Sequence, residues 1–231
     1  MSHNCFISFK KEDEYYKKEI LEKLGADRIK GRSLDKWIES EDIDYIMQVI
    51  RSQYMKNTSV TLFLIGKHSS ENEGFEYSSE DNCYNNKQNF IIRELKATFY
   101  DGKGNRRSGL LGIVLPDMYD AIYGGSYICS HCGEKINTVR INSQTVIREF
   151  SENYYLSPNC ESGHCDESGR FCVLVKYDDF IKNPDKYIDK SECVIKSNVN
   201  VVTLFFKRII NDNINILPNE RCKHEKNNTN N

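Results

Sequence analysis

The chain lacks several features that would assign it at once to a class of protein. It has no apolar run near the roughly 20 residues that a membrane-spanning helix needs, and residues 1–11 lack the apolar centre of a secretory signal. We therefore expect a cytoplasmic protein with no membrane partner. The 231 residues carry a formal net charge of −2, and no basic stripe with interleaved aromatic residues is present, so no nucleic-acid partner is expected either.

Motifs that cradle nucleotide phosphates are also missing. No glycine-rich loop follows the first apolar run, so the dinucleotide-binding fingerprint and the Walker A motif are both absent. Any nucleotide would have to be held in another way. Hydrophobic residues make up 39% of the chain, which is enough to build the core of one large domain or of one domain that carries an insertion.

Short apolar runs alternate with helical patterns along most of the chain. Strands buried on both faces read as continuous apolar runs, and such runs occupy residues 4–9, 60–66, 109–115 and 171–177, with a weaker strand signal ending near 34–37. Apolar residues recur at helical spacing in residues 14–24, 41–54 and 90–100. This alternation predicts an α/β fold in which helices cover both faces of a parallel sheet.

One long segment interrupts the alternation and suggests how the chain is organised. Residues 118–170 are rich in Cys, Gly and Ser and have little periodicity, whereas residues 67–87 are polar and are expected to form a loop. We predict four parts: the first part of the core at 1–117, a Cys-rich insertion at 118–170, the last strand and helix of the core at 171–217, and a disordered tail at 218–231.

Candidate binding residues follow from the geometry of parallel sheets. Ligands bind beyond the carboxyl ends of the strands, and this rule points to Ser8, Phe9 and Lys10 after the first strand. Glu94 is the single acidic residue in the helical stretch NFIIRELKATF. It is either a solvated residue that pairs with Lys96 or Arg93, or a carboxylate that acts on a bound sugar.

Several stretches of the chain resemble TIR domains, and more narrowly the TIR-like proteins of the Thoeris anti-phage defence systems. The stretches are FISF with its polar turn up to Asp13, NTSVTLFLIG at 57–66, GLLGIVLPD at 109–117, and the spacing of Phe90 and Glu94, which follows the family's W-x-x-x-E motif with Phe in place of Trp. The resemblance covers residues 3–117 well, is weaker from 171 to 210 and is absent from the predicted insertion.

The resemblance implies a flavodoxin-like sheet of five parallel strands and cleavage of NAD at the nicotinamide–ribose bond. Glu94 then corresponds to the catalytic Glu, and Ser8, Phe9 and Lys10 to the nucleotide-facing loop. Phe90 could support the helix or stack on a ring, more weakly than Trp would. Trp37, the single Trp, lies where the family has the loop after the second strand, and it is either a stacking residue or a core anchor.

Five of the nine cysteines lie in or next to the predicted insertion. Two close pairs, Cys129 with Cys132 and Cys160 with Cys165, could form a tetrahedral zinc site that stabilises a loop-rich segment. Free thiols and a redox pair are the alternatives. A thioredoxin-type role is not expected, because this C-x-x-C does not open a helix after a strand.

The leading hypothesis is a TIR enzyme, of the NAD glycohydrolase or ADP-ribosyl cyclase type, that converts NAD into an ADP-ribose-derived and probably cyclic signal. By the resemblance, this nucleotide signal would activate a partner effector in antiviral defence. The alternative is a non-enzymatic TIR module that acts through TIR–TIR assembly. The two hypotheses differ at Glu94, because an enzyme needs that carboxylate in an open cleft and a scaffold does not.

Overall fold

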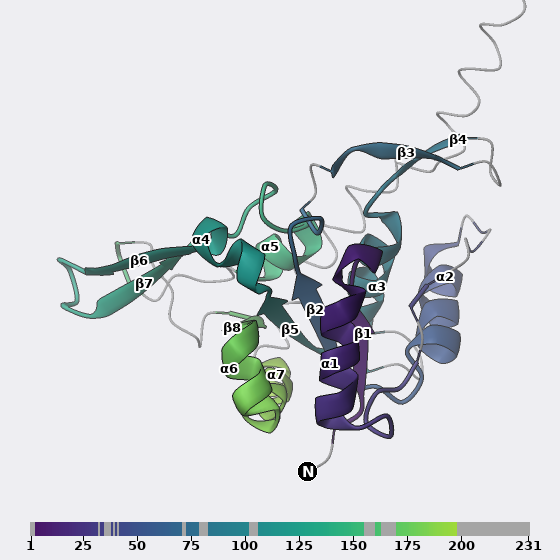
Figure 1. The fold of residues 1–231 in the computed structure, drawn as a ribbon, viewed down its shortest axis with the longest axis horizontal. Helices are drawn as coiled ribbons and strands as arrows, with labels where there is room; N and C mark the ends of the chain where they lie inside the picture. Colours follow the sequence, from purple (N-terminus) through teal and green to yellow (C-terminus); the bar gives the residue numbers. More distant parts are fainter. Residues whose placement is uncertain are drawn as a thin grey trace, which may run out of the picture.

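A computed structural model describes residues 3–31, 33–34, 38, 40, 42–70, 73–78, 83–101, 106–154, 160–162 and 170–197. At its centre lies a parallel sheet of four strands in the order β1-β2-β5-β8 (Figure 1). The strands are β1 (Cys5–Ser8), β2 (Val60–Ile65), β5 (Gly109–Val114) and β8 (Cys172–Lys176). Each corresponds to a predicted apolar run, and the predicted α/β class is confirmed.

The fifth predicted strand is reduced to a single bridge within the described part of the chain. Ile29 pairs in parallel with Cys5 of β1, and the Lys30 N–H donates a 2.8 Å bond to the Cys5 carbonyl. Ser33 and Leu34 are not in a strand, so the prediction of a strand ending near 34–37 is wrong at these described positions. With the Ile29 bridge placed beside β1, the order is that of a flavodoxin-like sheet.

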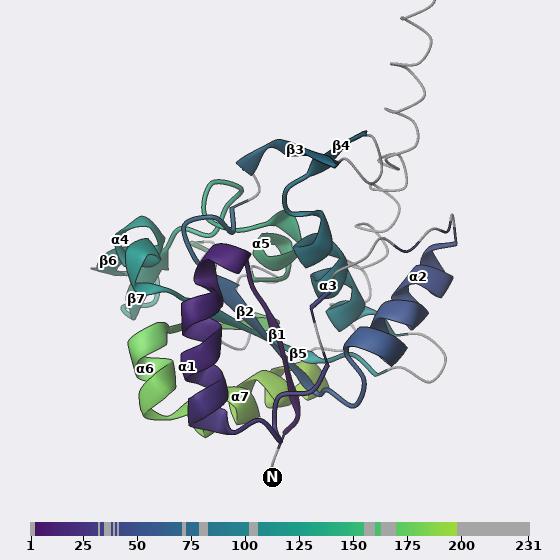
Figure 2. The same ribbon diagram turned by 45° about the vertical axis from the view of Figure 1, so that its right-hand side comes forward.

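Helices cover both faces of the sheet, as the two ribbon views show (Figures 1 and 2). Residues of three helices pack on one face: α1 (Glu14–Leu24), α6 (Tyr177–Lys182) and α7 (Pro184–Ser197). Residues of two helices pack on the other: α3 (Asn89–Phe99) and α5 (Arg148–Tyr154). Beside α3, α2 (Ile43–Val49) continues into a π-helical turn (Ile50–Tyr54) and packs on Phe6.

The predicted insertion contains two contrasting structures. Its helix α5 belongs to the core, because Phe150 is buried and its ring centroid lies 5.6 Å from that of Phe63 in β2. By contrast, the antiparallel hairpin formed by β6 (Tyr123–Ile128) and β7 (Lys135–Val139), which follows the short helix α4 (Tyr119–Ile122), projects from the body (Figure 1). The boundaries at 118 and 170 therefore stay a prediction.

Residues 67–87 are not the plain loop that their polar sequence predicts. They contain a second antiparallel hairpin, β3 (Phe75–Ser78) with β4 (Cys83–Asn86). Its aromatic residues Phe75, Tyr77 and Tyr84 are exposed, so the hairpin has no apolar run that would reveal it. The end of the predicted last part of the core, 198–217, and the tail at 218–231 lie outside the described residues. Every helix in the described ranges is too short or too polar to cross a bilayer.

Candidate active site

Glu94 points from α3 into the protein and not into solvent. Only 2% of its surface is exposed, and the same helix buries Ile91, Leu95 and Thr98. Thr98 fixes the helix on the sheet through a 2.9 Å contact between its Oγ1 and that of Thr61 in β2. The interpretation of Glu94 as a solvated partner of Lys96 or Arg93 is therefore wrong.

Both oxygens of the Glu94 carboxylate accept hydrogen bonds from separate parts of the chain. The Ser8 hydroxyl, at the end of β1, donates to Oε2 at 2.6 Å, and the backbone N–H of Leu34 donates to Oε1 at 2.8 Å. Burial raises the pKa of Glu94 to about 7, although these two hydrogen bonds and the charge of Lys17 oppose the rise. At neutral pH this carboxyl thus lies near the midpoint of its titration.

The loops around Glu94 are tied to one another by long polar side chains. The Lys10 ammonium donates to the Lys87 carbonyl at 2.8 Å. Next along the chain, the buried amide of Gln88 donates to the carbonyls of His68 and Ser70, at 2.7 and 2.9 Å. These bonds fix the loops after β1 and β2 to the start of α3. Gln88 was not found from the sequence, because a single polar residue in a polar stretch carries no distinguishing pattern.

The aromatic residues that were predicted to contact the substrate differ in how exposed they are. Phe90 is 40% exposed at the start of α3, one turn before Glu94. Phe9 is half-buried against the core, and the Lys17 ammonium lies 4.4 Å from its ring centroid. Trp37 lies outside the described residues. Of the predicted set, the structure therefore brings Ser8 directly onto Glu94.

A second buried carboxyl group lies at the same edge of the sheet. Asp13 stands at the N-terminal cap position of α1, but its side chain makes no capping hydrogen bond and is 6% exposed. It lies against Gly66, the residue after β2, where an added Cβ would come within 2.5 Å of the carboxylate oxygens. Burial, reinforced by the negative charge of Asp117, raises the pKa of Asp13 to about 6.

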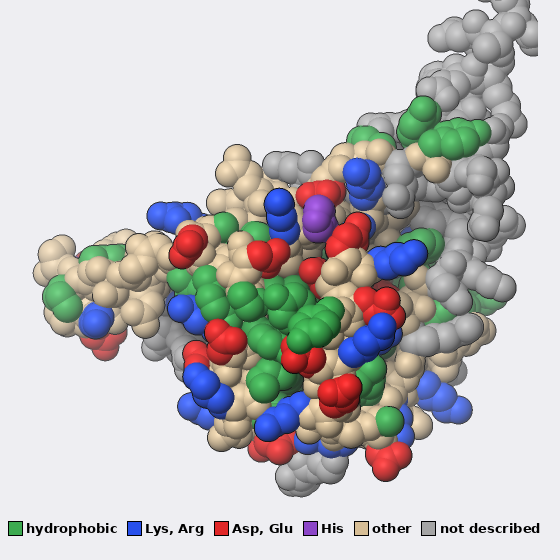
Figure 3. Space-filling view, viewed as in Figure 1, with side chains coloured by type: hydrophobic (Ala, Val, Ile, Leu, Met, Phe, Trp, Pro, Cys, Tyr) green, Lys and Arg blue, Asp and Glu red, His purple; other side chains and the backbone are tan. Residues whose placement is uncertain are grey.

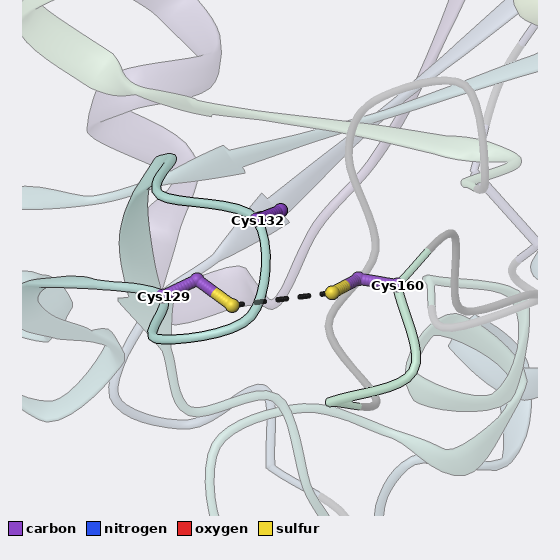
Figure 4. Close-up of side chains that lie close together, drawn as sticks. All are labelled: Cys129, Cys132 and Cys160. Carbon is purple, nitrogen blue, oxygen red and sulfur yellow. Dashed lines mark hydrogen bonds between the residues drawn. The ribbon is translucent and has the colours of Figure 1, made fainter.

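Three of the four predicted zinc ligands lie together, far along the chain from Glu94. The Sγ atoms of Cys129, Cys132 and Cys160 are all within 4.8 Å of one another, and Figure 4 shows the side chains of Cys129 and Cys160 directed at each other. The Ser162 hydroxyl, followed by the backbone amide of Cys132, lowers the pKa of Cys129 to about 5. Cys165 lies outside the described residues.

Comparison with protein families gives a match over the first third of the chain. Residues 6–77 match the family described as the TIR-like domain of the Thoeris protein ThsB, so this segment is similar to that domain. The match contains Ser8 and Leu34, the two hydrogen-bond donors to Glu94, but ends before Glu94 itself. Comparison with curated proteins and with solved structures gives no match.

Proposed function

We propose that this protein is a TIR enzyme that cleaves the nicotinamide–ribose bond of NAD, with Glu94 as the catalytic residue. One observation carries the proposal: a buried carboxylate is fixed at the carboxyl end of β1 by the Ser8 hydroxyl and the Leu34 N–H. The carboxyl ends of parallel strands are where α/β folds bind their ligands. A buried carboxyl with a raised pKa at such an edge is typical of a functional group.

The chemistry needs a fixed negative charge beside the ribose. Breaking the bond between the nicotinamide nitrogen and C1′ leaves the electron pair on nicotinamide and positive charge on the ribose, as in glycoside hydrolysis. An ionised Glu94 would stabilise that oxocarbenium ion, and its effect would be strong because water is excluded around it. Nicotinamide leaves as a neutral molecule, so no acid is needed to protonate it. The positive charge of bound NAD would also favour the ionised form of Glu94.

The two donors suggest how the ribose would be held. A ribose hydroxyl can donate to a carboxylate oxygen in place of the Leu34 N–H, which holds Oε1 in this structure. Substrate binding therefore requires the segment around Leu34 to move away from Oε1, whereas Ser8 can remain on Oε2. Lys10, Phe9 and the exposed ring of Phe90 are the candidates to contact the rest of the dinucleotide.

We further propose that the product is a signal and that NAD depletion is not the function. Attack on the oxocarbenium ion by a group of the same molecule gives a cyclic ADP-ribose isomer, whereas attack by water gives linear ADP-ribose. The burial of Glu94 supports the first outcome, because it keeps water from the reacting centre. The match of residues 6–77 to a Thoeris TIR-like domain supports a role in anti-phage defence, in which the signal activates a partner effector.

A matched pair of variants tests the catalytic role. Glu94→Gln keeps the shape and an acceptor for the Leu34 N–H, and its amide can donate to Ser8. Glu149→Gln alters another buried glutamate, on α5, whose Oε1 lies 3.6 Å from Lys96. With NAD and lysate from phage-infected cells as trigger, we expect Glu94→Gln to release nicotinamide at least about 100-fold more slowly, and Glu149→Gln to keep the wild-type rate. Near-wild-type turnover by Glu94→Gln would refute the proposal.

The same reaction mixture tests whether the product acts as a signal. The mixture is filtered so that only small molecules remain, and the filtrate is added to a Thoeris effector protein. We expect activation by the wild-type filtrate and none by the Glu94→Gln filtrate. If the filtrate is inactive and linear ADP-ribose accounts for all the NAD consumed, the protein is a plain NAD hydrolase.

A non-enzymatic assembly module is the second candidate, and one surface favours it. Figure 3 shows apolar side chains gathered between α1 and α6. On α1, Tyr15 is 65% exposed and contacts Tyr16, whose ring lies 4.9 Å from that of Tyr177 in α6. Light scattering separates the candidates: if Tyr15→Lys abolishes both oligomers and defence while Glu94→Gln leaves both intact, the protein acts by assembly alone.

A further inference from the structure

Three sulfur atoms from two distant parts of the chain converge beside the protruding hairpin. Cys129 and Cys132 lie in the turn between β6 and β7, whereas Cys160 lies beyond α5. The Sγ atoms of Cys129 and Cys160 are 3.9 Å apart (Figure 4). A disulfide would bring them to about 2 Å. Two thiolates on one tetrahedral zinc, with bonds of about 2.3 Å, lie about 3.8 Å apart, which is the spacing found here.

The backbone of the turn fixes the positions of two of the sulfurs. Backbone amides of His131 and Cys132 hydrogen-bond to the Cys129 sulfur, and the amide of Glu134 does so to the Cys132 sulfur. Gly133 makes this turn possible, because its φ of 74° favours glycine and its N–H closes the turn on the Cys129 carbonyl at 2.8 Å. The turn thus holds both sulfurs on the side that faces Cys160.

The described contacts that join the two segments beside the cluster are polar. The residues of β6 are exposed from Gly124 to Ile128, so the hairpin tip buries little apolar surface. The hydroxyl of Ser162 contacts both Cys129 and Cys160, at 3.1 Å in each case. The His131 Nε2 lies 3.5 Å from the exposed carboxylate of Glu161. A metal bound by thiolates from both segments would add a much stronger cross-link to these contacts.

We infer that Cys129, Cys132 and Cys160 bind one structural Zn²⁺ that fastens the β6–β7 hairpin to the chain beyond α5. These three sulfurs have the spacing of a shared tetrahedral metal. Cys165, which the sequence predicts as the fourth ligand, lies outside the described residues. Zinc sites that are rich in cysteine ligands and closed by protein groups have a structural role, not a catalytic one.

The experiment measures metal content and coordination in the whole protein. Elemental analysis of protein purified without chelator should give one zinc per chain. Cobalt-substituted protein should show the visible bands of tetrahedral Co²⁺ and the near-ultraviolet charge-transfer bands of thiolate coordination. Cys129→Ser and Cys160→Ser should each lower zinc content at least tenfold. Cys193→Ser, which alters an exposed cysteine on α7, should leave zinc content unchanged.

The cobalt spectrum keeps the test decisive if a serine variant fails to fold, because it is measured on the wild-type chain. Less than a tenth of an equivalent of zinc together with an absence of thiolate–cobalt bands would overturn the inference. A disulfide between Cys129 and Cys160, found by mass spectrometry without reductant, would also overturn it, as would iron in place of zinc. None of these outcomes depends on NAD cleavage.

Discussion

The surroundings of Glu94 and of Cys129 differ in what holds the side chains in place. Glu94 lies within the layered core, on a helix whose neighbouring residues are buried against β2, and its partners come from β1 and the backbone at Leu34. Cys129 lies at the tip of a protruding hairpin, where the long-range contacts are made by sulfur and the Ser162 hydroxyl. Hydrophobic packing can position a carboxylate, whereas a polar hairpin needs a cross-link of another kind.

The largest expected effect on the free energy of unfolding comes from removing the carboxylate of Glu94, which the core surrounds. In Glu94→Ala the Ser8 hydroxyl and the Leu34 N–H lose their buried acceptor. Each unpaired donor costs about 1–3 kcal/mol, so the free energy of unfolding should fall by about 4 kcal/mol. Urea denaturation at pH 7 measures this change. Glu94→Gln is the control, because it keeps both hydrogen bonds; an equal loss in both variants would contradict the explanation.

The second effect is a pH dependence of stability that arises in the core region. The pKa of Glu94 is about 7 in the folded protein, against an ordinary value of 4.5. The folded state therefore binds more protons between these values, and the stabilisation present below pH 4.5 is lost as the pH rises through 7. Relative to Glu94→Gln, the wild type should lose about 3 kcal/mol across this range.

Thermal unfolding of both proteins at several pH values checks this difference. Asp13 titrates in the same range, with a pKa of about 6, but it is present in both proteins, so its contribution cancels in the comparison. Parallel stability curves for wild type and Glu94→Gln would show that Glu94 does not titrate as described.

The smallest effect on global stability is expected at the hairpin. If zinc cross-links the hairpin tip, a chelator should leave the unfolding of the sheet almost unchanged, by less than about 1 kcal/mol, since β6 buries little apolar surface. Amide hydrogen exchange should nevertheless speed up in β6 and β7 and stay slow in β2 and β5. Uniform acceleration throughout the chain would mean that the two regions are not independent.

The sequence predicts the parts of the fold whose side chains have a clear pattern. The runs at β2 and β5 are apolar throughout because helices bury both of their faces. The hairpin β3–β4 was missed because its aromatic residues face solvent. The second strand was misplaced because the bridge at Ile29 depends on backbone groups, which leave no trace in side-chain periodicity.

The candidate site likewise contains some residues that the sequence predicts and others that it does not. The rule about strand ends identifies Ser8, and the motif spacing identifies Glu94, but their hydrogen bond joins residues far apart in sequence. The Leu34 N–H could not be predicted, since any non-proline residue offers this donor. The burial of Asp13 could not be predicted either, because it depends on the close approach of Gly66.

The strand order also has a consequence for how the protein emerges during synthesis. Ser8, Leu34 and Glu94 belong to the first half of the chain, whereas β8, which covers the edge of β5, comes only at Cys172–Lys176. Until the ribosome has delivered β8, the apolar strand β5 presents unpaired backbone groups on that side, and such an edge invites pairing with another chain. The nascent protein can thus bring Ser8, Leu34 and Glu94 together before β8 has paired with the open edge of β5.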